Sequence, residues 1–382
     1  MSFAAVSRTI GADHDNDRRA MAEIDLQDQK PGAATRGVFG LPARWYWERD
    51  IYQAERRQIF AREWQLVGPE SDLPRAGDYV AAEVAGYRFF VIRDRDGILR
   101  GFHNVCPHRA SQLLDDGAGH CDLLRCRYHG WVFDTQGNLR RAPDFGEAEW
   151  FRKENHGLMP IRIETWRGLV FANFDAGAPS LINSLGSLPQ TVQDYPIESF
   201  TKVRQVEFEM ACNWKNYTDN FVEGYHIPGI HPSFHAVIDF SKFETTHGDA
   251  LVIMTAPQKG GSIYGGLWLW GWPNFTLSVY PGGMNCSRIV PVAGNRTRLV
   301  YSFFFRDLSE VTAAQREQTI TTNCDIVRED FGICERSQAN LQAGIFRHGP
   351  LSPKHEVGVR YFHDRVRQAM AREGISEAEW LR

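Results

Sequence analysis

The spacing of apolar residues divides the chain into stretches with different patterns. Over residues 50–64, large apolar side chains recur at helical intervals among charged ones, which predicts an amphipathic helix packed on a core. From about Gly77, short apolar runs are separated by Gly and Asp-Gly turns, a pattern typical of short β-strands. The strands predicted here cover 79–84, 88–93 and 99–105, with a hairpin over 133–139 and a buried strand over 168–174.

The second half of the chain mixes helical and strand patterns. Alternation predicts a strand over 203–210, and an aromatic stripe predicts a helix over 213–225, while 309–343 is helical again. The aromatic stripe consists of Trp214, Tyr217, Phe221 and Tyr225. Further strands are predicted over 251–254, 266–272, 275–280, 286–292 and 298–305.

These patterns predict an α+β fold in more than one domain, because 382 residues are enough for two or three domains and a large buried core. Residues 1–38 are polar and poor in aromatics, so we expect a flexible arm. A small all-β domain with its N-terminal helix is expected over 39–180, ending in the turn-rich stretch 176–180. The second domain is expected over 181–382.

Composition excludes several classes of function. The formal net charge of -4, with 24% charged residues, argues against nucleic-acid binding and against a polybasic membrane surface. No apolar run reaches the length of about eighteen residues that a membrane span needs, and residues 1–32 carry no export signal. Five of the seven cysteines are scattered along the sequence and show no spacing typical of a disulfide framework, so we expect a reducing, cytoplasmic location.

The other two cysteines belong to the most informative motif, Cys106-Pro-His108 followed by Cys126-Arg-Tyr-His129, in the spacing Cys-x-His-x17-Cys-x2-His. Two short loops, each with one thiolate and one imidazole, can close on one small metal cluster. Soft sulfurs suit one iron and imidazole nitrogens suit the other, and the two imidazoles raise the reduction potential. A structural zinc site is the alternative, which the usual zinc-finger spacings disfavour.

A second group of candidate ligands lies at the end of the predicted helix 213–225 and just after it. Glu223 and His226 are three residues apart, which would place them on one helix face. Pro228-Gly229 breaks the helix, so that His231 can turn back toward the same point. Two imidazoles and a carboxylate make a facial triad with open positions for dioxygen and substrate. The alternative is a pair of ordinary core histidines.

The third ligand of this triad must be a distant carboxylate. Our choice is Asp330 in the predicted C-terminal helix, and Glu329 is the second choice because it points about 100° away on a helix. The alternative for Asp330 is a surface carboxylate. Asp219, one turn before Glu223, either orients a ligand or is an acid on the helix surface.

Together, the two motifs resemble the catalytic α subunit of Rieske non-haem iron oxygenases, the ring-hydroxylating oxygenase family, over residues 40–365. The resemblance implies an all-β Rieske domain and a helix-grip (START-like) catalytic domain with a central antiparallel sheet and a long C-terminal helix. The implied ligands are Cys106, His108, Cys126 and His129 for a [2Fe-2S] cluster, and His226, His231 and Asp330 for a mononuclear Fe(II).

Glu223 falls at the family's bridging acid position, and this is the one departure from the family pattern. The bridging acid links a cluster histidine of a neighbouring subunit to an iron-bound histidine. The implied assembly is a homotrimer, because the two metals within one chain are too far apart. That acid is usually Asp, and a Glu resembles the branch that acts on quaternary amines such as carnitine.

The resemblance implies a terminal oxygenase that activates O2 at Fe(II) and inserts oxygen into a small organic substrate. The chain has no Gly-x-Gly-x-x-Gly loop and no plant-ferredoxin cysteine run, so electrons must come from NAD(P)H through a separate flavin reductase, with or without a ferredoxin. The competing classes are an electron carrier, which would need only residues 45–180, and a binding protein without iron, which would not need both histidines and the distant acid.

Three tryptophans in one predicted strand bear on the substrate. Trp268, Trp270 and Trp272 alternate along a predicted strand and so face one way, with Tyr264 close by in sequence. They would form either a cage for a methylated ammonium or a slot for a flat ring, and the alternative is plain core packing. We favour a quaternary amine over hydroxylation or O-demethylation of an aromatic acid.

Overall fold

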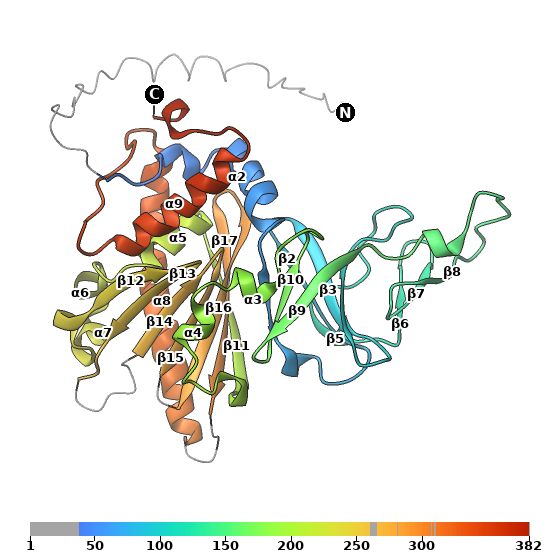
Figure 1. Ribbon diagram of the computed structural model, residues 1–382, viewed down its shortest axis with the longest axis horizontal. Coiled ribbons are helices and arrows are strands. Elements are labelled where there is room, and N and C mark those ends of the chain that lie inside the picture. The colour runs from blue at the N-terminus through green and yellow to red at the C-terminus, as the bar shows by residue number, and fades with distance from the viewer. Residues whose placement is uncertain (1–37, 260–265, 281, 307, 309–310, 382) are drawn as a thin grey trace, which may run out of the picture. The chain divides into compact units, whose positions relative to one another are not determined.

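The computed structural model describes residues 38–381 except 260–265, 281, 307, 309 and 310 (Figure 1). Two predictions fall outside the described residues: the arm over 1–38, apart from Val38, and the candidate pocket residue Tyr264. Within the described part of the chain, every helix is too short or too polar to cross a lipid bilayer.

The described chain begins with a helical segment that packs on elements from the second half. The segment consists of η2 (Ala43–Tyr46), α2 (Arg49–Glu55) and the π-helical turn η3 (Arg56–Phe60). The helix predicted over 50–64 therefore ends at Phe60. Its buried face belongs to the same hydrophobic core as Trp214 in the second half of the chain, because the Phe60 ring lies 5.0 Å from the Trp214 ring.

Two antiparallel sheets fill the region of the predicted small β domain. The larger has the strand order β1-β10-β9-β4-β3-β2-β5, and the smaller has the order β6-β7-β8 (Figure 1). All strands predicted here are present, whereas β1, β5, β6 and β9 were not predicted. The bounds are β1 Gln65–Pro69, β2 Asp78–Val84, β3 Tyr87–Arg93, β4 Leu99–His103, β5 Gly117–His120, β6 Leu123–Arg125, β7 Val132–Asp134, β8 Leu139–Arg141, β9 Pro160–Trp166 and β10 Leu169–Asn173.

The second half of the chain is built on one seven-stranded antiparallel sheet. Strands β12 to β17 follow one another in space as in sequence, and β11 pairs with β17 at the far edge. Every predicted strand is present, and β12 is the additional one. The bounds are β11 Thr201–Met210, β12 Glu244–Gly248, β13 Leu251–Ala256, β14 Gly266–Gly271, β15 Phe275–Tyr280, β16 Gly283–Ala293 and β17 Arg296–Phe305.

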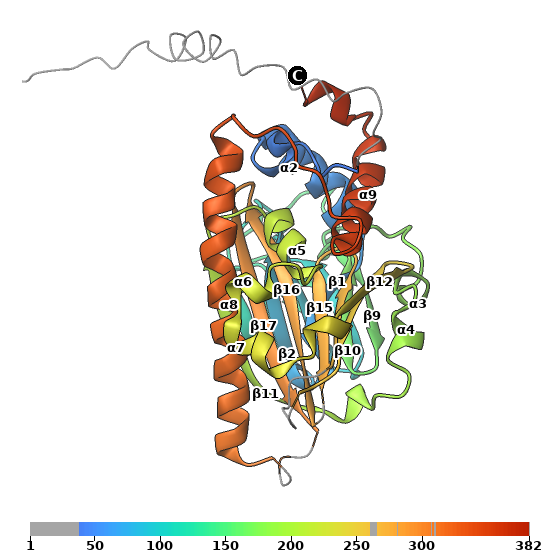
Figure 2. The ribbon, with the colours of Figure 1, turned by 90° about the vertical axis from the view of Figure 1, so that its left-hand side faces the viewer.

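Three longer helices pack on this sheet, namely α5 (Trp214–Phe221), α8 (Ala313–Gln342) and α9 (Val357–Ala371). Helix α8 lies along β11, β16 and β17 (Figure 2), where Phe331 packs on Phe208 and Asn323 contacts Asn285. It begins at Thr312 with a capping box, which satisfies free N–H groups of the first turn. Helix α9 was not predicted. The short helices are α3 Leu181–Ser184, α4 Leu188–Thr191, α6 Ile227–Ile230 and α7 Pro232–Val237.

The observed architecture confirms the predicted α+β fold class. The β-rich first half precedes a curled antiparallel sheet with the long helix α8 against it. The boundary at residue 180 stays a prediction. It falls between β10 and β11, at α3, but the segment around α2 packs on α5 and α9 and so shares their core.

Candidate metal centres and the cavity beside them

The two loops that carry the Cys/His motif have the same backbone hydrogen bonds. In each loop the cysteine N–H donates to the carbonyl five residues later, at 2.7 Å for Cys106 and 2.8 Å for Cys126. The residue four positions after each cysteine donates back to the cysteine carbonyl, at 3.0 Å in both loops. That residue is Ala110 in one loop and Gly130 in the other, with φ of 54° and 71°. The two halves of the motif are therefore one structural unit used twice.

Backbone N–H groups also point at both buried sulfurs. Those of His108 and Arg109 donate to the Cys106 thiol, and those of Tyr128 and His129 donate to the Cys126 thiol. Burial raises the pKa of Cys106 to about 11 in spite of its N–H donors. Burial also raises the pKa of Cys126, but the N–H groups, together with Cys106 and Ser111, outweigh it, and the net shift of this pKa is downward. Amide donors aimed at sulfur stabilise a thiolate, which is the form that binds iron.

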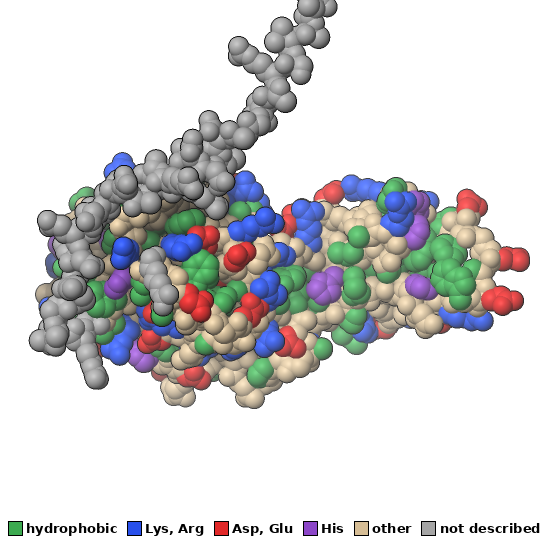
Figure 3. All heavy atoms as spheres, turned by 90° about the horizontal axis from the view of Figure 1, so that it is seen from above, with side chains coloured by type: hydrophobic (Ala, Val, Ile, Leu, Met, Phe, Trp, Pro, Cys, Tyr) green, Lys and Arg blue, Asp and Glu red, His purple; other side chains and the backbone are tan. Residues whose placement is uncertain are grey.

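The two imidazoles of the motif lie side by side. The ring centroids of His108 and His129 are 4.5 Å apart, and His108 stacks on Trp131 at 4.8 Å. His129 Nδ1 is buried without a hydrogen-bond partner among the described residues. A buried, unpaired nitrogen is rare in a folded protein and fits a metal ligand. Figure 3 shows histidine and hydrophobic side chains close together in the part with β6 to β8.

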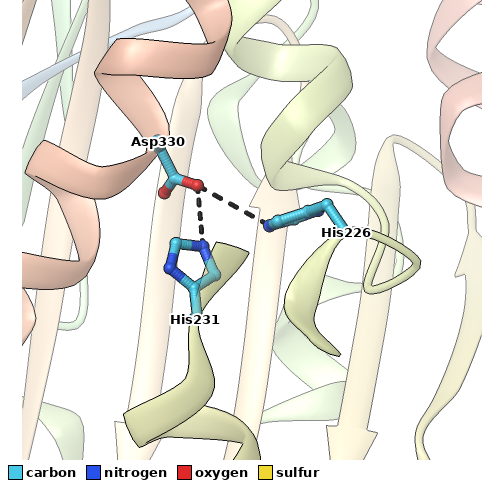
Figure 4. A group of neighbouring side chains, drawn as sticks. All are labelled: His226, His231 and Asp330. Atoms are coloured by element: carbon cyan, nitrogen blue, oxygen red, sulfur yellow. Dashed lines mark hydrogen bonds and ion pairs between the residues drawn. The ribbon is translucent and has the colours of Figure 1, made fainter. Parts of the chain in front are cut away.

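His226, His231 and Asp330 converge on one point (Figure 4), and their ligand atoms all lie within 4.8 Å of one another. Asp330 Oδ1 lies 2.8 Å from His231 Nε2 and 3.6 Å from His226 Nε2. Ligand atoms that share one metal at bonds of about 2.1 Å lie roughly 3 Å apart, so the observed spacing needs only small adjustments. The donor set and the spacing therefore both fit one metal ion.

The second ring nitrogen of each histidine is held by a glutamate. His226 Nδ1 lies 2.5 Å from Glu223 Oε1, and His231 Nδ1 lies 2.6 Å from Glu329 Oε2. Such contacts fix the tautomer and leave Nε2 free to face a metal. Burial lowers the pKa of His231, but bonds to Asp330 and Glu329 outweigh it, and the net pKa is raised. Glu329, our second choice for the third ligand, contacts His231 at Nδ1, whereas Asp330 contacts it at Nε2.

The predicted helix around Glu223 is wrong in its extent. Helix α5 ends at Phe221, so Glu223 and His226 do not share a helix face and instead lie in an irregular stretch before α6. The chain turns at Gly224, where a Cβ would collide with the Phe243 ring. Glu223 nevertheless reaches His226, and its other oxygen accepts the N–H of His226 at 3.3 Å. Tyr225, expected in the apolar stripe, is 58% exposed.

Asp219 has neither of the two roles predicted for it, which were to orient a metal ligand or to lie on the helix surface. Its carboxylate accepts a hydrogen bond from the Tyr46 hydroxyl at 2.5 Å and lies 2.8 Å from His363 Nε2. Asp219 is not among the residues that line the cavity beside the triad. It therefore connects α5 to η2 and α9, and the sequence offered no signal for it because its partners are 173 and 144 residues away.

Comparisons with known proteins agree with this geometry. Residues 63–156 match the Rieske [2Fe-2S] domain, and residues 197–265 and 253–372 match the ring hydroxylating alpha subunit (catalytic domain). The carnitine monooxygenase oxygenase subunit of Escherichia coli (strain K12) is 30% identical over 353 residues, which cover 86% of this chain and 93% of that protein. The chain belongs to the Rieske non-haem iron oxygenases.

Two further relatives are similar over most of their length. The chloroplastic choline monooxygenase of Beta vulgaris is 28% identical over 335 residues, covering 84% of this chain and 75% of that protein. A quaternary ammonium Rieske monooxygenase of known structure is 26% identical, with a TM-score of 0.80 and coverage of 87% and 96%. That structure is described in terms of carnitine oxidation and inter-subunit electron transfer.

The family confirms the predicted class of enzyme and its cofactors. The chain is the terminal oxygenase component of a Rieske system, an O2-dependent oxidoreductase with a Rieske [2Fe-2S] cluster and a mononuclear iron. An electron carrier is disfavoured because the match continues through the catalytic domain, and a structural zinc site is disfavoured because the Cys/His motif lies within the matched Rieske domain.

The triad of this Rieske oxygenase opens on a cavity of about 100 Å³, several times the room that one water molecule needs. Close to the triad the cavity has an aromatic corner, formed by Phe234, Phe243 and Trp268. The Trp268 ring centroid lies 5.6 Å from that of Phe234 and 6.3 Å from that of Phe243. The aromatic corner is close to the triad because the Phe234 ring lies 6.5 Å from the His231 ring.

Of the predicted tryptophans, only Trp268 lines this cavity. Trp270 points to the same face of the sheet but is fully buried, with its ring 5.2 Å from Phe362 of α9 and 6.1 Å from Trp272. Trp272 lies beyond the end of β14. Of the three tryptophans predicted to form a substrate pocket, one therefore lines the cavity, and the other two pack in the hydrophobic core.

Sequence reasoning missed a group of polar residues that also line the cavity, among them Ser278, which is the cross-strand partner of Trp268. We call this group the polar floor, and it consists of Thr276, Ser278, Ser287, Tyr301 and Asn323. The signal was available, because Thr276, Ser278 and Ser287 interrupt otherwise apolar strands at alternate positions. A polar residue at an inward position of a buried strand needs a partner and often marks a site.

Proposed function

We propose that this terminal oxygenase acts on a quaternary amine. The observation that carries the proposal is the aromatic corner beside the triad, in a cavity whose lining acids are Glu223 and Asp330. A methylated ammonium is attracted by aromatic faces and by nearby carboxylates, and it has no hydrogen to donate to a polar partner. Relatives named for choline and carnitine support the same substrate class.

The residues of the triad would hold the iron from one side. His226 Nε2, His231 Nε2 and the Asp330 carboxylate face one another, and the cavity lies next to all three. When bound, the iron supplies dioxygen activation and the cluster supplies electrons. The aromatic corner would hold the ammonium so that a carbon attached to nitrogen faces the triad, and its rings exclude water from that position.

We further propose that Cys106, His108, Cys126 and His129 hold the cluster. In a homotrimer, Glu223 would bridge the cluster of a neighbouring subunit and the iron, on the path that the electrons follow. None of these four cluster residues lines the cavity. Both histidines are half-buried, so that a partner can reach their ring edges. Glu223 already contacts His226 Nδ1 and would complete the path with its carboxylate. Inter-subunit electron transfer in a relative of known structure supports this arrangement.

Mixed trimers test whether the cluster of one subunit and the iron of its neighbour form one shared site. A subunit with Cys126→Ser lacks a cluster ligand, and a subunit with His226→Ala lacks a ligand of the mononuclear iron. Co-expression with two affinity tags yields trimers that contain both subunits. We expect each pure variant to be inactive and the mixed trimer to regain product formation, because an intact cluster then faces an intact iron site. Inactive mixed trimers whose remaining intact cluster and iron sites are loaded with metal, or a fully active monomer, would contradict the shared site.

Reductase-driven oxygen uptake tests the substrate class. The purified holoenzyme is offered trimethylammonium compounds and planar aromatic acids, and both oxygen uptake and product are measured. We expect coupled product only with the ammonium compounds. Coupled product only with the aromatic acids would overturn the proposal, and the enzyme would then be a ring hydroxylase or O-demethylase.

Electrons would come from NAD(P)H through a separate flavin reductase, with or without a ferredoxin, since the chain contains no dinucleotide-binding loop. We also propose a cytoplasmic location. The cysteines of the described chain are free thiols, and those outside the Cys/His motif are Cys121, Cys212, Cys286, Cys324 and Cys334. Free thiols are typical of a reducing compartment.

A further inference from the structure

We infer that Trp131 positions the His108 imidazole and lowers the reduction potential of the cluster that this histidine would help to hold. The inference rests on the proposed ligands of the cluster and adds to them a residue that touches one ligand without binding metal. It comes from an asymmetry between the two Cys/His loops, which share their backbone hydrogen bonds but not their ring contacts.

The two loops differ at the residue five positions after the cysteine. In both loops the carbonyl of this residue accepts the N–H of the cysteine, but the residue is Ser111 in the first loop and Trp131 in the second. The Trp131 ring extends from the second loop to a candidate ligand of the first. It stacks on the His108 ring, with the centroids 4.8 Å apart and an angle of 5° between the planes. One side chain therefore connects the two halves of the motif.

Trp131 is held in place by its own surroundings. It is 3% exposed, and three further rings meet it edge to face, those of Phe145, Phe151 and His156, at centroid distances of 5.7, 5.8 and 6.2 Å. Phe145 and Phe151 also stack on each other at 4.1 Å. Because a ring packed on several sides cannot turn away, the orientation of the His108 imidazole stacked on it is fixed as well.

The other histidine of the motif has a different aromatic neighbour. The Tyr128 ring lies 3.8 Å from the His129 ring at an angle of 33°, and Tyr128 is 54% exposed. Water reaches Tyr128 and screens the electrostatic effect of its ring on His129, whereas the effect of the buried Trp131 ring on His108 is not screened. The two histidines are therefore not equivalent in their surroundings.

The stacked indole ring favours the oxidised form of the cluster. The two histidines would hold the iron that accepts the electron, because neutral imidazoles make an iron easier to reduce than two thiolates do. An imidazole bound to Fe(III) carries more positive charge than one bound to Fe(II), and the face of an indole ring is negative. The indole also fills space beside His108 that water would otherwise reach, and water stabilises the more negative reduced form. Both effects lower the reduction potential.

A redox titration of the purified holoenzyme at one pH, monitored by the visible absorption and the EPR signal of the cluster, tests the inference. In Trp131→Leu, the ratio of reduced to oxidised cluster at a fixed potential should rise about two- to fivefold, which matches the strength of a cation–ring contact. This is a rise of about 20–40 mV in midpoint potential, since a tenfold change corresponds to about 59 mV for one electron. The EPR signal of the reduced cluster should broaden, because the His108 ring is no longer fixed in one orientation. Trp131→Phe keeps a ring and should give values between those of Trp131→Leu and the wild type.

Phe133→Leu is the matched control. Phe133 is 0% exposed and belongs to the same hydrophobic core as Trp131, whose ring lies 6.4 Å away, and within the described chain it has no ring contact with either histidine of the motif. It should lower the urea midpoint and leave the potential and the EPR signal unchanged. An unchanged potential in Trp131→Leu, or an equal rise in Phe133→Leu, would overturn the inference. If Trp131→Leu does not retain its cluster, Trp131→Phe decides, and a potential and an EPR signal identical to those of the wild type then overturn it.

The proposed ligands have a separate test. In His108→Ala, the EPR signal of the Rieske cluster should be lost. If that signal persists unchanged, the assignment of the cluster ligands fails, whatever the Trp131 variants show. If it is lost while the potential of Trp131→Leu equals that of the wild type, the ligands stand and only the role of Trp131 fails.

Discussion

The two candidate metal-binding regions of this protein are assembled in opposite ways. The Cys/His motif is made by two adjacent loops of one hairpin-rich region, and each loop closes on its own backbone hydrogen bonds. The triad consists of two histidines beside α6 and an aspartate on α8, which lies 99 residues after His231. The glutamates behind its histidines come from both places as well.

The geometry of the first region therefore depends on nearby residues, whereas the geometry of the second depends on residues far apart in the sequence. The geometry of the Cys/His loops follows from a few residues, so a change far away should leave it intact. The triad depends on how α5 and α8 are held together, through contacts such as Asn213 N–H to Gln338 Oε1 at 2.9 Å and Asn216 Nδ2 to the Cys334 carbonyl at 3.0 Å.

Removing one ligand of the triad should abolish turnover without disturbing the cluster. In His226→Ala, product formation should drop by about 10³-fold or more, because the iron would lose one of its three proposed protein ligands. The visible absorption of the cluster should be unchanged. Metal analysis should show loss of the mononuclear iron only. His247→Ala, at an exposed histidine outside both motifs, is the control. Substantial turnover by His226→Ala would show that the triad is not the oxygen-activating centre.

A buried ion pair far from the iron should matter for the triad and not for the loops. Lys215 of α5 contacts Glu55 of α2, and both side chains are 0% exposed. Glu55→Gln leaves the lysine charge buried and should lower the free energy of unfolding by about 3–5 kcal/mol. In urea, the mononuclear iron should be lost before the cluster absorption decreases. Simultaneous loss of both metals would contradict the proposed independence of the loops.

The matched control for this variant is Glu48→Gln. Glu48 pairs with Arg44 at 2.7 Å on the surface of the same N-terminal segment. A solvent-exposed pair contributes about 0–1 kcal/mol. The difference between the two variants therefore isolates the effect of burial on the same type of substitution.

Glu329→Gln tests the contact behind His231. The carboxylate fixes the imidazole orientation and increases its basicity, so its loss should weaken iron binding by about 10–100-fold. Iron titration of the apo triad, monitored by competition with a chelator, measures this affinity, and the cluster content should stay constant. Glu317→Gln, on the exposed side of α8 and paired with Arg204, should have no effect on iron binding. Unchanged affinity in Glu329→Gln would show that His231 is oriented by other contacts.

The same contrast explains what could be read from the sequence. The four candidate Cys/His ligands lie within 24 residues (106 to 129) in a fixed spacing, and alternation with Gly turns predicted most strands. Helix α9 was missed although Val359, Phe362, Val366 and Met370 repeat at helical intervals and are all buried. That omission was avoidable, because the pattern was present.

Other features were not readable because they depend on distant partners. The apolar stripe continues to Tyr225, but α5 ends at Phe221, and Gly224 then passes close to the Phe243 ring. The pairing of Glu329 with His231 spans 98 residues. No local pattern distinguishes Trp268, which reaches the cavity, from Trp270, which is covered by α9.

The smallest predicted effect compares the two Cys/His loops with each other. Ala110 and Gly130 occupy equivalent positions with positive φ, a conformation that a residue with a Cβ adopts at a cost of about 1 kcal/mol. Gly130→Ala has space around its new Cβ, whose nearest neighbour would be 3.6 Å away, so only the backbone conformation is penalised. It should lower the unfolding free energy of the cluster region by about 0.5–1 kcal/mol, and Ala110→Gly should raise it by a similar amount, less the extra entropy of the unfolded chain. Urea midpoints followed by cluster absorption measure both. Because the loops share their hydrogen bonds, opposite signs are expected, and the same sign in both variants would show that the loops are not equivalent.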